Sequence, residues 1–130
     1  MKQDQIILAI DYGMKNVGIA MATSSIAEPL EVIKMETALE KIASIIDEKR
    51  ITLVLMGISE GKMAVLTRDF AKKIQLRTRV EVKFWDETLS SQETRKLTAA
   101  ALMKRKKREG KQDHFVAARI LQDYLDTMLV

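Results

Sequence analysis

Acidic side chains border apolar segments at three separate points of this sequence. Asp11 follows one apolar run, Asp86 and Glu87 follow another, and Asp113 precedes a periodic apolar segment. Carboxylates that converge repel one another unless a cation lies between them. Mg²⁺ and Mn²⁺ prefer oxygen ligands, and a pair of such ions stabilises both the attacking and the leaving oxygen of phosphodiester hydrolysis. If the fold brings these acids together, they predict metal-dependent cleavage of a phosphodiester.

Each of these acids also has an ordinary structural role that the residues alone leave open. Asp11 lies two residues before Gly13 and could form a turn. Asp113 could cap the helix that follows it or interact with that helix's dipole. Asp86 and Glu87 could be exposed turn residues. The acids therefore become a site only if the predicted elements bring them to one place.

The composition restricts what kind of site this can be. The chain contains no cysteine and a single histidine, His114. Disulfides, thiolate zinc sites, iron–sulfur clusters and cysteine nucleophiles are thereby excluded, and any metal must be held mainly by oxygen. His114 could move a proton or assist product release beside Asp113, or it could be an ordinary exposed histidine.

The length and the apolar pattern predict one globular domain over residues 1–130. A chain of 130 residues has no room for the two lobes of a kinase or an actin-like ATPase. The polar start does not fit a signal peptide, and no apolar stretch approaches the roughly 20 residues of a membrane span. Together with the absence of cysteine, this predicts a cytoplasmic protein without a membrane partner.

Positive charge is concentrated in one short segment. The formal net charge is +4. The basic segment comprises Lys104, Arg105, Lys106, Lys107, Arg108 and Lys111. Such a segment is either a solvated loop or a clamp for a phosphate backbone, which it would bind with little sequence preference. Aromatic residues are only 5% of the chain, so base stacking is expected to be minor, with Phe84 and Trp85 in the core.

Smaller polar groups near the acids could also contact phosphate. Lys15 lies just past the first turn, and Ser90 and Ser91 follow the second acidic pair. The lysine could instead be solvated, and the serines could cap a helix.

Hydrophobic periodicity predicts the elements that would position these groups. Strands are expected near residues 6–10, 17–22, 30–35, 51–56 and 80–86, with helices near 37–50, 63–74, 91–104 and 117–128. Thr37 and Glu40 have the spacing of a capping box, and Gly57 is expected to close its strand. The order β-β-β-α-β-α-β-α-α predicts an α/β fold, a mixed five-stranded sheet flanked by helices, with the first strand central. Parallel first and last strands would end at one edge, where the final helix could bring Asp113.

Four sequence blocks resemble those of a known family. The first has the form D-x-G-x-K-x-x-G-x-A, with Asp11, Gly13, Lys15, Gly18 and Ala20. The second is a strand ending in Gly57, and the third is residues 86–91, Asp-Glu-Thr-Leu-Ser-Ser. The last comprises Asp113, Ala117, Ile120 and Leu121. In this order and at this length the blocks resemble the YqgF family, Holliday-junction-resolvase-like proteins with a ribonuclease-H-like fold.

The resemblance implies a nuclease that uses Mg²⁺ or Mn²⁺. It implies a catalytic, metal-binding triad of Asp11, Glu87 and Asp113, with Asp86 as a neighbour. Processing of the 5′ end of precursor 16S rRNA is the favoured activity, with ribosomal particles as partners. A junction resolvase acting on branched DNA is the alternative, and it would need two sites, hence a homodimer rather than a monomer.

Two other classes of function remain open. The chain could be a non-catalytic nucleic-acid-binding module that keeps the fold, or an actin-like nucleotide-binding fragment. The intact triad argues against the first, and the chain length argues against the second.

This sequence departs from the family pattern at three places. Thr88 replaces an arginine, residues 57–59 read Gly-Ile-Ser instead of Gly-Leu-Pro, and Met14 replaces a threonine or serine. None of these positions is one of the three acids, so the departures concern substrate contacts more than chemistry.

Overall fold

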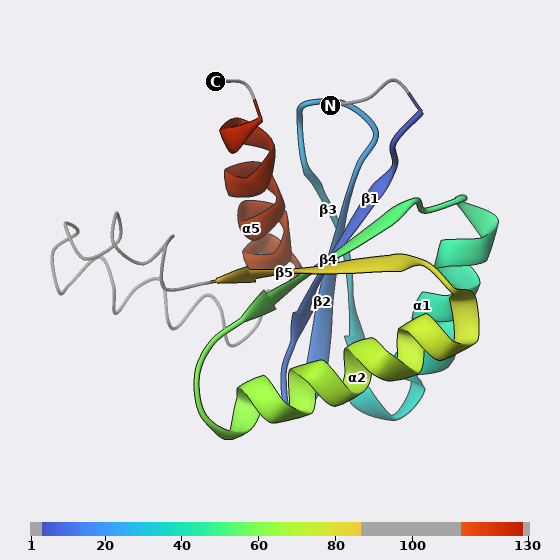
Figure 1. The fold of residues 1–130 in the computed structure, drawn as a ribbon, viewed down its shortest axis with the longest axis vertical. Coiled ribbons are helices and arrows are strands. Elements are labelled where there is room, and N and C mark those ends of the chain that lie inside the picture. Colours follow the sequence, from blue (N-terminus) through green and yellow to red (C-terminus); the bar gives the residue numbers. More distant parts are fainter. Residues whose placement is uncertain (1–3, 87–112, 129–130) are drawn as a thin grey trace, which may run out of the picture.

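A five-stranded sheet with helices on both faces forms the described part of the protein (Figure 1). The computed structural model describes residues 4–86 and 113–128. Its elements are β1 (Ile7–Tyr12), β2 (Asn16–Ala22), β3 (Glu28–Lys34), α1 (Met35–Glu48), β4 (Leu53–Ile58), α2 (Lys62–Thr78), β5 (Glu81–Asp86) and α5 (Asp113–Thr127). The helix expected near residues 91–104 and the basic segment lie outside these residues. No helix in the described ranges has both the length and the apolar character that crossing a bilayer requires.

The strand order places β1 at the centre of the sheet, as predicted. The order is β3-β2-β1-β4-β5, with β1 antiparallel to β2 and parallel to β4, which is in turn parallel to β5. The carboxyl ends of β1, β4 and β5 therefore meet at one edge of the sheet. We call this the carboxyl edge.

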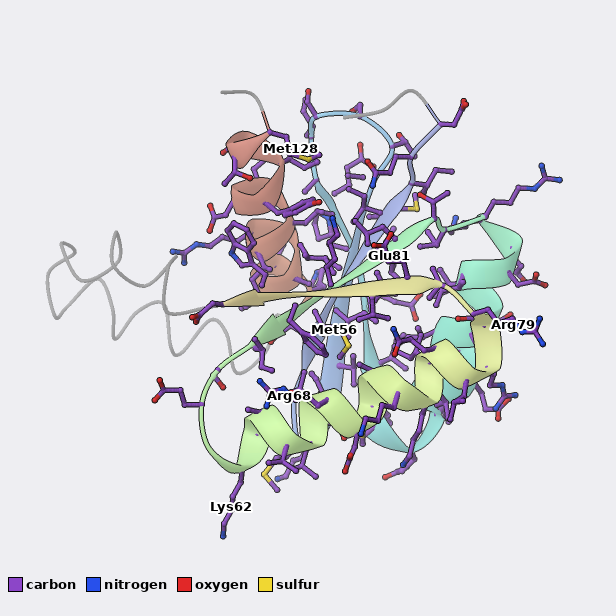
Figure 2. The ribbon with its side chains drawn as sticks, in the orientation of Figure 1. Met56, Lys62, Arg68, Arg79, Glu81 and Met128 are labelled. Carbon is purple, nitrogen blue, oxygen red and sulfur yellow. The ribbon has the colours of Figure 1, made fainter. Side chains whose placement is uncertain are left out.

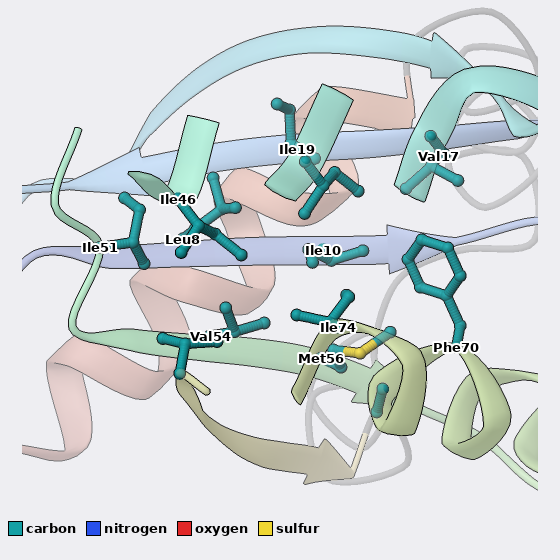
Figure 3. Close-up of a cluster of buried hydrophobic side chains, with 14 of the residues drawn as sticks. Leu8, Ile10, Val17, Ile19, Ile46, Ile51, Val54, Met56, Phe70 and Ile74 are labelled. Atoms are coloured by element: carbon teal, nitrogen blue, oxygen red, sulfur yellow. The ribbon is translucent and has the colours of Figure 1, made fainter. Parts of the chain in front are cut away.

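Side chains alternate between the two sheet faces, and each face has its own core. On one face, Leu8 and Ile10 of β1 pack with Val54 and Met56 of β4 beneath α1 and α2 (Figure 3). Ile74 of α2 is fully buried in this cluster. We call this side of the sheet the α2 face.

The other face is covered by α5, and we call it the α5 face. Its core joins the strands to one stripe of the helix, formed by Ile7, Ala9, Ala20, Ala22, Leu53, Leu55, Ala117, Ile120, Leu121 and Leu125. The side chain of Gln122 fastens the helix to the β2–β3 connection, because its Oε1 accepts from the Ala27 amide at 2.9 Å and its Nε2 donates to the Ser25 carbonyl at 3.0 Å. That connection lies at the edge opposite the carboxyl edge, so α5 begins toward the carboxyl edge (Figure 1).

The expected capping box is wrong. Helix α1 begins at Met35, directly after β3, and Thr37 lies inside its first turn, where its hydroxyl donates to the Lys34 carbonyl at 3.4 Å. The Glu40 carboxylate binds Arg77 of α2 instead of turning back to the helix start. The Met35 amide is paired with the Lys15 carbonyl, and the N-cap is Lys34, three residues before the Thr37 that the motif suggests.

Three further residues, Gly57, Leu66 and Phe84, differ in the structure from what the sequence pattern predicts. Gly57 does not close its strand, since β4 continues to Ile58 and Gly57 pairs with Trp85 of β5. Leu66, one of the apolar residues whose spacing predicts the helix near residues 63–74, is 40% exposed, and small residues such as Ala64 and Ala71 occupy part of the buried face. Phe84, also expected in the core, is 43% exposed because β5 is an edge strand.

Candidate active site at the carboxyl edge

Asp11 lies at the carboxyl edge of the central strand. It is half-buried and is the last residue but one of β1. The alternation of β1 puts Asp11 on the same side as Ile7 and Ala9, which is the α5 face. The strand expected near residues 6–10 is present, but it continues to Tyr12, so Asp11 lies inside its carboxyl-terminal end and not in the turn that follows.

Glycines flank Asp11 on both neighbouring strands. Gly18 of β2 is its partner in the antiparallel pair. On the other side, the parallel register pairs Ile10 with Met56, so Asp11 stands next to Gly57 of β4. Directly opposed Cβ atoms in a sheet are only about 4.5–5.5 Å apart. Because both neighbours are glycines, neither adjacent strand places a side chain directly beside the Asp11 carboxylate on this face.

Two backbone hydrogen bonds hold the turn that follows Asp11 and Tyr12. The Gly13 amide donates to the Asn16 carbonyl at 3.1 Å, and the Met35 amide donates to the Lys15 carbonyl at 3.0 Å. The Tyr12 ring packs on Phe70 of α2, with ring centroids 4.8 Å apart. Lys15 is exposed in this turn, so its ammonium group is available near Asp11.

The end of β5 reaches the same edge with two residues on opposite faces. Trp85 packs on the α5 face, edge-on to Tyr124 with ring centroids 5.7 Å apart. Asp86 is exposed and, by the alternation of β5, lies on the α2 face. Asp86 is thus on the opposite side of the sheet from Asp11. Glu87, Ser90 and Ser91 lie outside the described residues, as do Thr88 and the basic segment.

The third acid is the first residue of α5. Asp113 precedes the buried Ala117 by one helical turn. His114 is half-buried, and its ring stacks on Phe115 with centroids 4.3 Å apart. Within the described residues, the buried atoms Nδ1 of His114 and Nε1 of Trp85 have no hydrogen-bond partner. Buried polar atoms without a partner are uncommon in folded proteins.

The described ranges contain one of the proposed carboxylates at the carboxyl edge of the sheet, Asp11. These ranges hold no group of three His, Asp or Glu side chains arranged for a metal ion. Asp11 itself offers carboxylate oxygens on the α5 face, between two glycines, and carboxylate oxygen is the ligand that hard divalent ions prefer. Glu60 is a further exposed acid in the loop after β4, at the same edge.

Sequence reasoning missed the residues that support the site without reacting. The pairing of Gly57 with its neighbours depends on strand register, which periodicity does not reveal. Gln122 carries no pattern that would single it out from other polar helix residues. Trp85 was expected in the core, and its position next to Gly57 follows only from the β4–β5 pairing.

The fold is similar to that of a known resolvase. The structure titled "T. thermophilus RuvC in complex with Holliday junction substrate" matches with a TM-score of 0.65 at 13% sequence identity, covering 96% of each chain. A second Thermus thermophilus RuvC structure matches with a TM-score of 0.51 over 63% of this chain and 64% of its own. These likenesses confirm the predicted ribonuclease-H-like fold.

Sequence relatives extend over nearly the whole chain. Proteins from Endomicrobium trichonymphae and Halothermothrix orenii are each 35% identical, over 92% of this chain and 94% of their own. A Chlamydia trachomatis protein is 34% identical, over 97% of this chain and 95% of its own. All three bear the name "Putative pre-16S rRNA nuclease". A family model described as RuvX, Holliday junction resolvase, matches residues 5–127, and the chain therefore belongs to this family of nucleases, hydrolases of phosphodiester bonds.

Proposed function

We propose that this protein is a divalent-metal-dependent nuclease whose catalytic triad is Asp11, Glu87 and Asp113. The observation that carries the proposal is the place of Asp11. It ends the central strand on the α5 face, and glycines stand beside it on both neighbouring strands. A carboxylate in such a position can hold an ion and still leave space for a phosphate.

Strand geometry favours Glu87 over Asp86 as the second acid. Asp86 lies on the α2 face, away from Asp11. The resemblance to the family assigns the second acid to Glu87, the residue that follows β5 in the sequence. Asp113, as the first residue of α5, comes from the helix that covers the same face. The three acids would then approach one site from β1, β5 and α5.

The proposed chemistry assigns a separate task to each group. Asp11, Glu87 and Asp113 would hold Mg²⁺ or Mn²⁺. Such ions, when bound, lower the pKa of water and neutralise charge on the transferring phosphoryl oxygens. Lys15, exposed in the turn after Asp11, would bind a phosphate beside the one that is cut. Ser90, Ser91 and the basic segment would hold the flanking backbone with little sequence preference.

The favoured substrate is the 5′ end of precursor 16S rRNA. The relatives that share about a third of their residues with this chain bear the name of that activity. Such a role would bring ribosomal particles as partners and would take place in the cytoplasm, and a monomer would suffice. The family description and the resolvase-like fold favour branched DNA as the second candidate. Cutting a symmetric junction needs two sites, so that activity would require a homodimer.

The test is cleavage by single-residue variants of the full chain. Substrates are an RNA spanning the precursor 16S 5′ leader, its mature-end control and a four-way DNA junction, each with Mg²⁺, Mn²⁺ or EDTA. Asp11→Asn, Glu87→Gln and Asp113→Asn should each lower the cleavage rate by more than about 100-fold, since even groups behind metal ligands cost roughly 10- to 100-fold. Asp86→Asn is the matched control and should retain activity, because its side chain lies on the other face.

Three outcomes would contradict the proposal or one of its assignments. Cleavage that persists in EDTA would exclude the metal-dependent mechanism. RNA binding without cleavage, unchanged by Asp11→Asn, would identify a non-catalytic binding module. Equal losses from Asp86→Asn and Glu87→Gln would contradict the assignment of the second acid.

A further inference from the structure

Helix α2 carries a row of cations on one flank. Arg68 and Lys72 are one turn apart on α2, and Arg79 follows at its C-cap (Figure 2). All three are exposed. The polar residue Gln75 continues the row between them, and the single acid of the helix, Asp69, lies about 100° around the helix from Arg68. We call Arg68, Lys72 and Arg79 the α2 row.

The contact between α2 and α1 determines where the α2 row points. Arg77 binds Glu40 of α1 through two N–O contacts of 2.6 Å each. Arg68 is nine residues before Arg77, which corresponds to half a turn around an α-helix. Arg68 and Lys72 therefore lie on the flank away from α1, and Arg79 follows the end of the helix. Because α2 packs over β4 and β5 and β5 is the last strand, that flank adjoins the β5 side of the sheet.

An exposed aromatic ring lies on the same side. Phe84 of β5 shares the α2 face with Val82 and is 43% exposed. An aromatic ring that remains exposed beside cations is a typical feature of surfaces that bind single-stranded nucleic acid. There the ring stacks on a base and the cations follow the backbone.

This surface is continuous with the carboxyl edge. Phe84 pairs with Met56, which pairs with Ile10, the residue before Asp11. Two strand spacings, about 10 Å, therefore separate the Phe84 and Ile10 backbones. Helix α2 starts at the carboxyl edge and runs away from it. The α2 row thus leads away from the proposed site, over about 17 Å from Arg68 to Arg79 at the rise of an α-helix.

We infer that Phe84 and the α2 row bind the single-stranded segment of the substrate that adjoins the cleavage site. This inference rests on the proposed function, because it places the flanking strand on the α2 face while the cut occurs on the α5 face. The strand passes around the β5 edge, stacks a base on Phe84 and continues along the α2 row. The binding is independent of base sequence, since stacking and phosphate contacts do not distinguish bases.

The test measures binding apart from cleavage. Fluorescence anisotropy in EDTA, with Asp11→Asn as the parent protein, compares an oligouridine with an RNA duplex of equal length. Phe84→Ala should weaken oligouridine binding by about 5-fold or more and leave duplex binding nearly unchanged. Lys72→Gln should lower the slope of log Kd against log salt by about 0.7 for oligouridine. Thermal melts show whether each variant remains folded.

Matched controls lie on the same helix. Lys73→Gln removes the same charge at the next residue, which lies on the Arg77 side of the helix. This variant should leave the slope of log Kd against log salt unchanged. Leu76→Ala removes an 86% exposed apolar side chain and should bind oligouridine as the parent does. If Phe84→Ala and Lys72→Gln also bind as the parent does, the inference is wrong. If they change self-association instead of RNA binding, the face is a protein interface and the inference is likewise overturned. Absence of cleavage by the wild-type protein, with oligouridine binding changed as expected, would count against the proposed function and leave the assignment of this binding surface standing.

Discussion

Gly13 is required because another backbone atom occupies the space of a side chain. A Cβ at this position would lie 2.6 Å from the Asn16 carbonyl oxygen, well inside ordinary contact. The same oxygen accepts the hydrogen bond from the Gly13 amide, and the neighbouring Lys15 carbonyl is tied to Met35. The turn therefore cannot move the oxygen away without loosening the end of β1, which carries Asp11.

The size of the effect of Gly13→Ala follows from these contacts. Overpacking against a fixed atom costs about 1–3 kcal/mol, and loss of the Gly13–Asn16 hydrogen bond about 0.5–1.5 kcal/mol. Reduced entropy of the unfolded chain returns roughly 0.4–1 kcal/mol. The free energy of unfolding should fall by about 2–3 kcal/mol, which corresponds to about 10 °C in Tm for a domain of this size.

Urea unfolding of the full chain measures this change directly. Met14→Ala is the control, because it truncates a 76% exposed side chain in the same turn and should stay within about 0.5 kcal/mol of wild type. Nuclease activity of Gly13→Ala, assayed where both proteins are fully folded, should also fall because the Asp11 end of β1 shifts. A Gly13→Ala variant as stable as Met14→Ala would refute the reasoning, since it would show that the turn accommodates a Cβ.

Three further predictions concern the packing around the site. Leu55→Ala should destabilise the protein by about 3–5 kcal/mol in urea unfolding, because its side chain is fully buried on the α5 face; a loss below about 1 kcal/mol would mean that α5 does not pack there. Gln122→Ala should cost about 1–3 kcal/mol and speed amide exchange at the β2–β3 connection, because the Ala27 amide loses its acceptor; unchanged exchange would contradict this role. A double-mutant cycle on Arg77 and Glu40 should give less than about 1 kcal/mol, falling with salt, because both side chains are largely exposed.

The order of elements and their topology could be predicted because the apolar runs are unambiguous. The run before Asp11 has no polar interruption, which is typical of a strand buried on both faces, and β1 is indeed central. Element boundaries were less predictable. The capping-box spacing at Thr37 predicted a later helix start. In the structure α1 begins at Met35, directly after β3, and the Met35 amide donates to the Lys15 carbonyl.

The candidate site could be predicted in part. The position of Asp11 followed from the end of its strand, and the common edge followed from parallel pairing. The separation of Asp86 from Asp11 could not be predicted, because a shift of one residue reverses the face of every side chain and the sequence does not state the register. The exposure of Phe84 was also missed, for a different reason. Alternation shows which residues share a face, but it does not show that a strand lies at the edge of the sheet.

The way α5 covers the sheet has a consequence for the synthesis of the chain. All five strands precede α5 in the sequence, so they leave the ribosome first, at about 5–20 residues per second. Until α5 follows, the apolar side chains of one whole sheet face, such as Ile7, Leu53 and Leu55, have no cover. A nascent chain in this state is prone to bind chaperones. The helix that completes this core also begins with Asp113, so a chain in which α5 has not yet folded also lacks the last of the three proposed metal ligands.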